Sequence, residues 1–209
     1  MDRFCEVTDK VFRGSCPTPE ELKGLKDIFG IKRIISLDGP LADQLASHCK
    51  NLDIEQIKLP IEFDNFGPML QKLKEDIVPM LLDNQPCFIH CRHGKDRTGA
   101  AIALYRIQGE NWKPGDALKE AEEFDFGSGL QPEVLKFYTD IILNCENDIG
   151  DDSNNAYDSD STVGGLQQQN SFAPMGPQPY IRMAQEDKKQ KKKEKLKKLL
   201  DDSNDADIQ

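Results

Sequence analysis

The sequence has no long apolar run. Its 209 residues contain no stretch of about 18 consecutive apolar residues, and no positively charged then apolar segment with a cleavage site opens the chain. A membrane-spanning helix needs about 20 predominantly apolar residues, and a secretory leader needs a charged segment followed by an apolar one. We therefore expect neither a membrane span nor secretion.

Regular cysteine spacing is also absent. The six cysteines are scattered, with no Cys-x-x-Cys pair and no repeating framework. Secreted disulfide scaffolds and structural zinc sites both depend on such spacing. We expect no metal ion and no other cofactor, and we expect the cytoplasm as the setting, because a chain with a functional free thiol suits a reducing compartment.

An excess of positive charge is missing as well. The chain has 27 Lys and Arg against 37 Asp and Glu, which gives a net charge of −10. Domains that hold nucleic acid through its phosphates carry a basic surface. We therefore expect no stable nucleic-acid binding by the globular part, and any phosphate preference must come from a local site.

The composition changes near residue 147. Residues 148–187 are polar and rich in Asp, Asn, Gln and Pro, which predicts a disordered linker after a domain over residues 1–147. Residues 188–209 begin with eight lysines within 188–198 and end acidic. This tail is typical of a solvated charged helix, and the alternative is a weak contact with an anionic membrane or RNA.

Within the first 147 residues, predicted strands alternate with predicted helices. This alternation predicts an α/β fold, with a central, mostly parallel sheet flanked by helices. A capping box precedes the first helix, and Pro79 is expected to bend or end the helix that contains it. The expected strands are 31–37, 54–59 and 86–90, and the expected helices are 18–30, 41–50, 69–82, 99–108, 114–124 and 132–145.

The stretch from residue 90 to residue 100 combines a cysteine with the features of an anion-binding loop. Cys91 is followed by five residues and then by Arg97-Thr98, with an apolar run before and a small-residue helical stretch after. A strand thus delivers the thiol into a loop that leads directly into a helix. Helix N-termini present unpaired N–H groups that bind phosphate and favour the nucleophilic thiolate. The spacing therefore predicts nucleophilic attack by Cys91 on a bound phosphate.

The other residues of the loop have complementary expected roles. Gly94 allows the chain to curl, and Gly99 allows close packing where the helix starts. Arg97 can grip two phosphate oxygens with its planar guanidinium group, and Thr98 can donate its hydroxyl to the sulfur. His90 is expected to orient the loop by hydrogen bonding and not to act as an acid.

These residues resemble the signature loop of the cysteine-based protein tyrosine and dual-specificity phosphatase superfamily. Segments 11–22 and 30–37 before the loop, and 105–120 after it, are similar to small prokaryotic and atypical dual-specificity phosphatases. The resemblance covers about residues 8 to 145. It implies a protein-tyrosine-phosphatase-like fold and makes residues 1–147 the catalytic domain, while the disordered C-terminal tail is expected from the composition.

The reaction needs an acid for the leaving oxygen and then a base for water, and one carboxyl group can do both. In the resembled family this group lies on the loop that corresponds here to residues 59–68. Asp64 is our prediction, and Glu62 in the same segment is an alternative. Asp96 is the rival, because inositide phosphatases of the myotubularin and Sac types carry Asp-Arg-Thr at this place and use that aspartate. Otherwise, Asp96 only hydrogen-bonds loop amides or pairs with Lys95.

The cations inside the loop bear on the substrate. Arg92 and Lys95 exceed what a single phosphate needs, which suggests a multiply phosphorylated ligand, unless both side chains point outward. Lipid phosphatases of the phosphatase-and-tensin type are similar at both positions, and inositol-pyrophosphate phosphatases of fungi and plants share Gly94-Lys95. His93 is expected to shape the loop and not to bind metal. The predicted phosphate-binding residues are Arg92, His93, Gly94, Lys95, Asp96 and Arg97.

The combined expectation is a monomeric, cytoplasmic phosphatase that acts through a phosphocysteine on phosphotyrosine or phosphoserine/threonine proteins. The alternatives within the same chemistry are an inositol phosphate, a phosphoinositide and the 5′-triphosphate end of RNA. The alternative from a different class of protein is a catalytically silent module that binds phosphate without hydrolysing it. The presence of Cys91, Arg97 and Thr98 together argues against a silent module.

Overall fold

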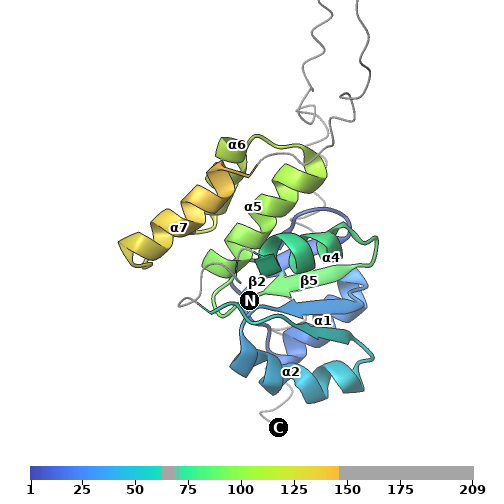
Figure 1. Ribbon diagram of the computed structural model, residues 1–209. Helices are drawn as coiled ribbons and strands as arrows, with labels where there is room; N and C mark the ends of the chain where they lie inside the picture. The colour runs from blue at the N-terminus through green and yellow to red at the C-terminus, as the bar shows by residue number, and fades with distance from the viewer. Residues whose placement is uncertain (63–68, 70, 146–209) are drawn as a thin grey trace, which may run out of the picture.

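The computed structural model describes residues 1–62, 69 and 71–145, and these residues build a five-stranded sheet (Figure 1). The strand order is β1-β2-β5-β3-β4, in which β1 pairs antiparallel with β2 and all other neighbours are parallel. The prediction of a mostly parallel sheet is confirmed. The strands are β1 Cys5–Glu6, β2 Val11–Gly14, β3 Arg33–Ser36, β4 Glu55–Lys58 and β5 Cys87–His90.

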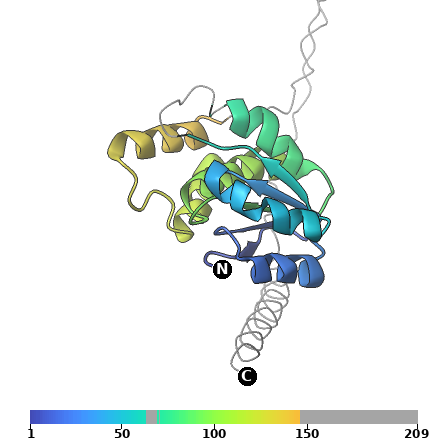
Figure 2. The same cartoon turned by 90° about the horizontal axis from the view of Figure 1, so that it is seen from below.

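Helices cover both faces of this sheet (Figures 1 and 2). Helices α1 and α2 pack on one face, and the other helical segments lie on the opposite side, where α6 and α7 pack against α5. The expected α/β arrangement with flanking helices is therefore also confirmed. The helical segments are α1 Pro19–Phe29, α2 Gly39–Asn51, the π-helical η1 Lys72–Ile77, α4 Val78–Leu82, α5 Asp96–Glu110, α6 Pro114–Glu123 and α7 Pro132–Leu143.

Strand β5 separates two hydrophobic cores. Phe88 packs with Phe12 and with side chains of α1 and α2, whereas Cys87 and Ile89 pack with η1, α4 and α5. Successive side chains of a strand point to opposite faces, so a strand buried on both sides must be apolar throughout. Burying each large apolar side chain contributes about 1.5–3 kcal/mol. The central strand is thereby held rigidly in place.

The first helix begins and ends as its sequence predicts. The Thr18 side chain accepts a hydrogen bond from the Glu21 backbone N–H, and the Glu21 carboxylate accepts one from the Thr18 N–H. Pro19 occupies the first turn, where its missing N–H is no loss. Gly30 closes the helix in the left-handed conformation, with φ of 69°.

Two helices differ from the expectation. Helix α5 begins at Asp96 and not at residue 99, so Arg97 and Thr98 lie within its first turn. The helix that contains Pro79 is not regular: its π-helical part η1 ends at Ile77, α4 begins at Val78, and Pro79 lies in the first turn of α4. Proline lacks an N–H and clashes with the carbonyl four residues earlier, and a π-helical turn removes that conflict.

The order of the strands places the end of β5 at a switch point. Strand β5 lies between β2 and β3, and the chain leaves β2 and β3 toward the face covered by α1 and α2 but leaves β5 toward the opposite face, with α5. In open parallel sheets, ligands bind beside the carboxyl ends of strands at such a point. Cys91 directly follows the last residue of β5.

Several predictions from the sequence lie outside the described residues. The predicted linker 148–187 and the lysine-rich tail 188–209 are among them, and so is Asp64. Among the residues that the structure describes, no helix is both long enough and apolar enough to span a bilayer.

Candidate active site

Cys91 lies where β5 leads into the loop before α5, and its side chain is buried, with 5% of the residue exposed. The residue before it is fixed on both sides: His90 Nε2 lies 2.8 Å from Ser36 Oγ, and His90 Nδ1 lies 3.2 Å from the Cys91 carbonyl oxygen. Burial lowers the pKa of His90 to about 4. The imidazole is therefore neutral near pH 7, which fits the predicted orienting role.

The back of the loop is held by the N-terminal segment of the chain. The carbonyl oxygens of residues 92, 93 and 94 accept hydrogen bonds from Cys16 N at 3.3 Å, Arg3 Nη1 at 3.1 Å and Arg13 Nη2 at 2.7 Å, respectively. The C=O and N–H of a trans peptide point in opposite directions. The N–H groups of residues 93, 94 and 95 therefore point away from this segment, into the loop, where they can bind an anion.

Gly94 is required at the turn of the loop for two reasons. Its φ is +71°, a left-handed conformation that side-chain-bearing residues rarely adopt. A Cβ atom at this position would also lie 2.4 Å from the Gly14 carbonyl carbon and 2.6 Å from the Ser15 nitrogen. Both contacts are to the backbone of the chain leaving β2, which cannot move aside as a side chain can. The curl predicted from the sequence is therefore tied to close packing against that segment.

Arg97 is oriented by an aspartate that the sequence analysis did not single out. Arg97 Nη1 donates to Asp38 Oδ2 at 3.0 Å, and Arg92 Nε lies 3.6 Å from the same oxygen. The other oxygen of Asp38 accepts a hydrogen bond from Leu41 N, so Asp38 also caps α2. Asp38 is buried and is the second residue after the end of β3. In the sequence, the signal that could have identified Asp38 is a carboxylate just beyond a predicted buried strand and just before Gly39-Pro40.

Thr98 and Gly99 complete the first turn of α5. The Thr98 hydroxyl is fully buried and has no hydrogen-bond partner among the residues that the structure describes. Buried hydroxyls are rarely left without a partner, so this one is available to the sulfur or to a bound phosphate. At Gly99, a Cβ atom would lie 2.9 Å from Phe126 Cδ2. The absence of a side chain lets Phe126 pack directly on α5.

Asp96 and Lys95 both face the loop between α6 and α7. Asp96 Oδ1 accepts a hydrogen bond from the Gly127 N–H at 2.9 Å, and its residue is only 9% exposed. Lys95 Nζ binds the carbonyl oxygen and the hydroxyl of Ser128. Arg3 bridges the same region, because it donates to Asp125 as well as to the His93 carbonyl. These contacts hold residues 125–128 against the loop that contains Cys91.

The segment that contains the predicted acid approaches the same edge of the sheet. The backbone N–H groups of Leu59 and Ile61 donate to the carbonyls of Ser36 and Leu37. Glu62 follows and is exposed. Asp64 itself lies outside the described residues. Of the remaining loop residues, Arg92 and His93 are exposed.

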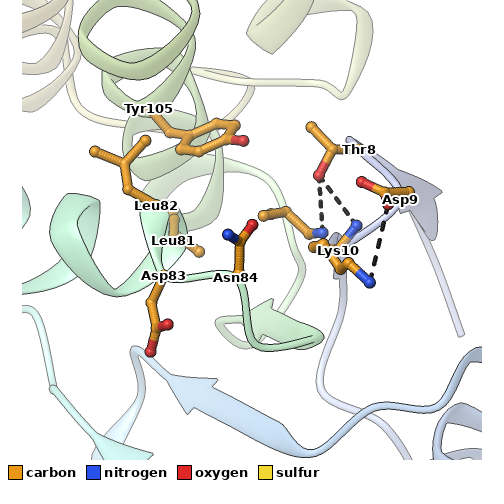
Figure 3. Close-up of a pocket in the computed structure, with 9 residues that line it drawn as sticks. Thr8, Asp9, Lys10, Leu81, Leu82, Asp83, Asn84 and Tyr105 are labelled. Atoms are coloured by element: carbon orange, nitrogen blue, oxygen red, sulfur yellow. Dashed lines mark hydrogen bonds and ion pairs between the residues drawn. The ribbon is translucent and has the colours of Figure 1, made fainter.

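A separate hollow of about 160 Å³ lies at the other end of β2 and β5 (Figure 3). Figure 3 shows Tyr105 and Leu82 on one side of it and Thr8 and Lys10 on the other. The Lys10 carbonyl there accepts a hydrogen bond from Cys87 N, at the beginning of β5. Cys91 follows the opposite end of that strand, so this hollow is not part of the candidate active site.

Comparison with known proteins agrees with this geometry. The chain is 29% identical over 133 residues to inositol diphosphatase DSP3 of Arabidopsis thaliana, which covers 61% of this chain and 63% of that protein. It is 43% identical over 42 residues to the dual-specificity protein phosphatase TpbA of Pseudomonas aeruginosa, covering 20% of this chain and 19% of that protein. The chain thus spans less than two thirds of the length of these curated relatives.

A solved structure and a family model extend the comparison. The core catalytic domain of the inositol-pyrophosphate (PP-IP) phosphatase SIW14 from Saccharomyces cerevisiae superimposes with a TM-score of 0.53 at 26% identity, over 65% of this chain and 82% of that one. The model of the tyrosine phosphatase family matches residues 1–157, which include every element of the sheet and the loop after β5. The chain therefore belongs to the tyrosine phosphatase family.

Proposed function

We propose that this protein is a cysteine-dependent phosphatase that hydrolyses phosphomonoesters through a phosphocysteine intermediate. The arrangement of the loop around Cys91 carries the proposal. Its carbonyl groups at residues 92 to 94 are bound from behind, so three consecutive N–H groups face its interior. Together with the N-terminus of α5, they form a site for a phosphate directly beside the thiol.

The first half of the reaction is attack of the Cys91 thiolate on phosphorus. A sulfur–phosphorus bond forms, the bond from phosphorus to the ester oxygen breaks, and that oxygen takes a proton from the acid. Arg97, held by Asp38, binds two of the non-bridging oxygens as charge builds on them. In the second half, a water molecule attacks phosphorus and gives a proton to the carboxylate. The sulfur–phosphorus bond breaks, and the Thr98 hydroxyl donates to the departing thiolate.

Asp64 remains our proposed acid, and the contacts of Asp96 favour a different role for that residue. The Asp96 side chain accepts the Gly127 N–H and is largely buried, so it is engaged in holding the α6–α7 loop. A group that alternates between acid and base must reach the leaving oxygen. The exposed Glu62 stays the alternative within the segment that contains Asp64.

We propose phosphorylated proteins as the primary substrates, with inositol phosphates second. The side chain of Lys95 contacts Ser128, and Arg92 lies near Asp38, so both loop cations already have partners within the protein. This supports a substrate with one phosphate in the loop. The similarity to inositol diphosphatases favours the second candidate, and so does the Gly94-Lys95 pair, at which the sequence resembles such phosphatases. We further propose a cytoplasmic monomer, with the lysine-rich tail 188–209 as a weak contact to anionic membranes or RNA.

Turnover of p-nitrophenyl phosphate tests the reaction class. We expect the wild-type chain to be active and Cys91→Ser to lose at least about 10³-fold in kcat. Cys87→Ala, a change at a buried thiol four residues earlier in β5, serves as the control and should keep its activity. Activity that survives in Cys91→Ser would rule out cysteine-dependent catalysis. Comparing phosphopeptides with inositol phosphates and diphosphates, by kcat/KM, then ranks the two substrate classes.

A further inference from the structure

We infer that Arg13 is a positioning residue for phosphate binding, acting through the backbone of the loop and not through contact with the substrate. The inference rests on the proposed phosphatase function and extends it to a residue behind the loop. Arg13 is the third residue of β2, and its side chain is among the largest fully buried ones, at 1% exposure. A charged residue so deeply buried in a short interior strand is unusual.

The guanidinium group of Arg13 has a single hydrogen bond that the structure records. Nη2 donates to the Gly94 carbonyl oxygen at 2.7 Å, while Nε and Nη1 have no hydrogen-bond partner among the described residues. The ring of Phe124 lies 4.1 Å from the guanidinium carbon and covers it. Burial lowers the pKa of Arg13 to about 10, so the group is still charged at neutral pH. The charges that act on it are those of Glu120 first, then Cys5 and Cys91, and its one recorded hydrogen bond is to the loop.

Holding the Gly94 carbonyl determines where the next N–H points. The carbonyl of Gly94 and the N–H of Lys95 belong to one peptide and point in opposite directions. With the oxygen bound to Arg13, the Lys95 N–H is directed into the loop interior. Gly94 itself is pressed against the backbone of Gly14 and Ser15, the residues that follow Arg13, so strand β2 supports the same peptide twice. The charge of Arg13 also lies close enough to Cys91 to interact with it electrostatically.

A purely structural role makes a different prediction. If Arg13 only filled space beneath the loop, an apolar side chain of similar length would fold as well and bind anions as well. Replacing a buried charge with a well-packed apolar group is often neutral for stability. If Arg13 orients the Lys95 N–H, the same replacement weakens the binding of any tetrahedral oxyanion, because one charge-assisted hydrogen bond is lost or misdirected.

The test is tungstate binding to the full-length chain, measured by calorimetry, with the folded state checked by circular dichroism. We expect Arg13→Met to weaken tungstate binding by about ten- to a hundredfold and to raise KM for p-nitrophenyl phosphate along with it. Arg106→Met is the matched control, because Arg106 is also buried and also lies over an aromatic ring, that of Trp112. It should keep the wild-type tungstate affinity within about twofold.

Tungstate affinity of folded Arg13→Met within twofold of wild type overturns the inference, as does an equal loss in Arg106→Met. If Arg13→Met does not fold, Arg13→Lys decides: its ammonium is one bond shorter and cannot lie flat on Phe124, so we expect a loss of about threefold or more. Unchanged affinity in Arg13→Lys then rejects the role. If the wild-type chain neither binds tungstate nor hydrolyses p-nitrophenyl phosphate, the proposed function itself fails.

Discussion

The buried polar groups near the two ends of helix α5 differ in how completely they are hydrogen-bonded. At the C-terminal end, Arg106 donates from Nε and Nη2 to the two carboxylate oxygens of Glu120 and from Nη1 to Glu110. Burial alone would lower the pKa of Arg106, but the hydrogen bonds and charges of Glu120 and Glu110 raise it well above its usual range. Every nitrogen of this guanidinium group has a partner inside the protein.

At the N-terminal end, some buried polar groups lack hydrogen-bond partners among the described residues. Arg13 makes one hydrogen bond, and the Thr98 hydroxyl makes none among the described residues. Leaving buried donors unpaired is costly, so such groups are expected to have a purpose other than stability. The difference teaches that a fully paired buried group joins elements of the fold, whereas a cluster of underpaired ones around a thiol fits the proposed binding of an anion.

The largest expected effect is the loss of activity on changing Arg97, at the N-terminal end of α5. This change tests the difference between the two ends most directly, because activity should fall while stability is kept. Arg97→Lys keeps the charge but loses the planar two-pronged grip on phosphate, so we expect kcat/KM for p-nitrophenyl phosphate to fall by about 10³-fold. Thermal stability should change little. Wild-type kcat/KM in Arg97→Lys would show that the loop does not bind phosphate as proposed, and steady-state kinetics of the two proteins decides this.

Arg106→Met is the converse change at the other end. Removing one partner of a buried ion pair leaves Glu120 without compensation, and we expect a loss of about 3 kcal/mol in the free energy of unfolding. The kcat/KM of the folded protein should stay within about twofold. Urea denaturation measures the loss, and Arg106→Met/Glu120→Leu should recover most of it. A large loss of activity without loss of stability would contradict the division between the two ends.

His90 makes the catalytic end sensitive to acid. Its pKa in the folded chain, about 4, is below its usual 6.5, because burial disfavours the charged form. The associated stability is complete above pH 6.5 and is lost as the pH falls toward 4, amounting to about 2 kcal/mol lost by pH 5. His90→Gln removes this titration. Urea denaturation at pH 7 and pH 5 should show a smaller acid-induced loss in the variant, and equal losses would disprove the assignment.

Asp96→Asn is expected to have the smallest effect. It distinguishes a residue that only holds the α6–α7 loop from one that acts as the general acid. Asparagine keeps an oxygen that can accept the Gly127 N–H but has no proton to transfer. We expect kcat within about threefold of wild type, whereas loss of a general acid costs about 10²- to 10⁴-fold. Asp64→Asn should show that larger loss with a poor leaving group. Should the two variants behave the other way round, Asp96 is the acid.

The sequence was informative wherever a residue's role depends on its near neighbours. Thr18, Glu21 and Gly30 set the limits of α1 through local hydrogen bonds and backbone conformation, and the structure has them as predicted. The mostly parallel sheet followed from the alternation of apolar strand and helix patterns. The cysteine, arginine and threonine of the loop were recognisable because their spacing along the chain is itself the geometry of an anion site.

The residues that support this loop could not be predicted in the same way. Asp38, Arg13 and Arg3 lie 53 to 88 positions before Cys91 in the chain, and no local pattern links them to it. They meet the loop because β5 pairs with β2 on one side and β3 on the other. Arg13 had one visible sign, a charge within an apolar strand, but its partner depended on strand order.

The same division applies to the functional conclusions. A linear stretch of eleven residues was enough to indicate the chemistry, since a strand, a thiol, a curled backbone and a helix start follow one another without a break. The contacts of Asp96 and Lys95 depended on folding, because the α6–α7 loop lies against the loop that contains Cys91 and provides their partners. Short-range hydrogen bonds are encoded locally, whereas contacts between distant segments follow from how a whole sheet and its helices pack together.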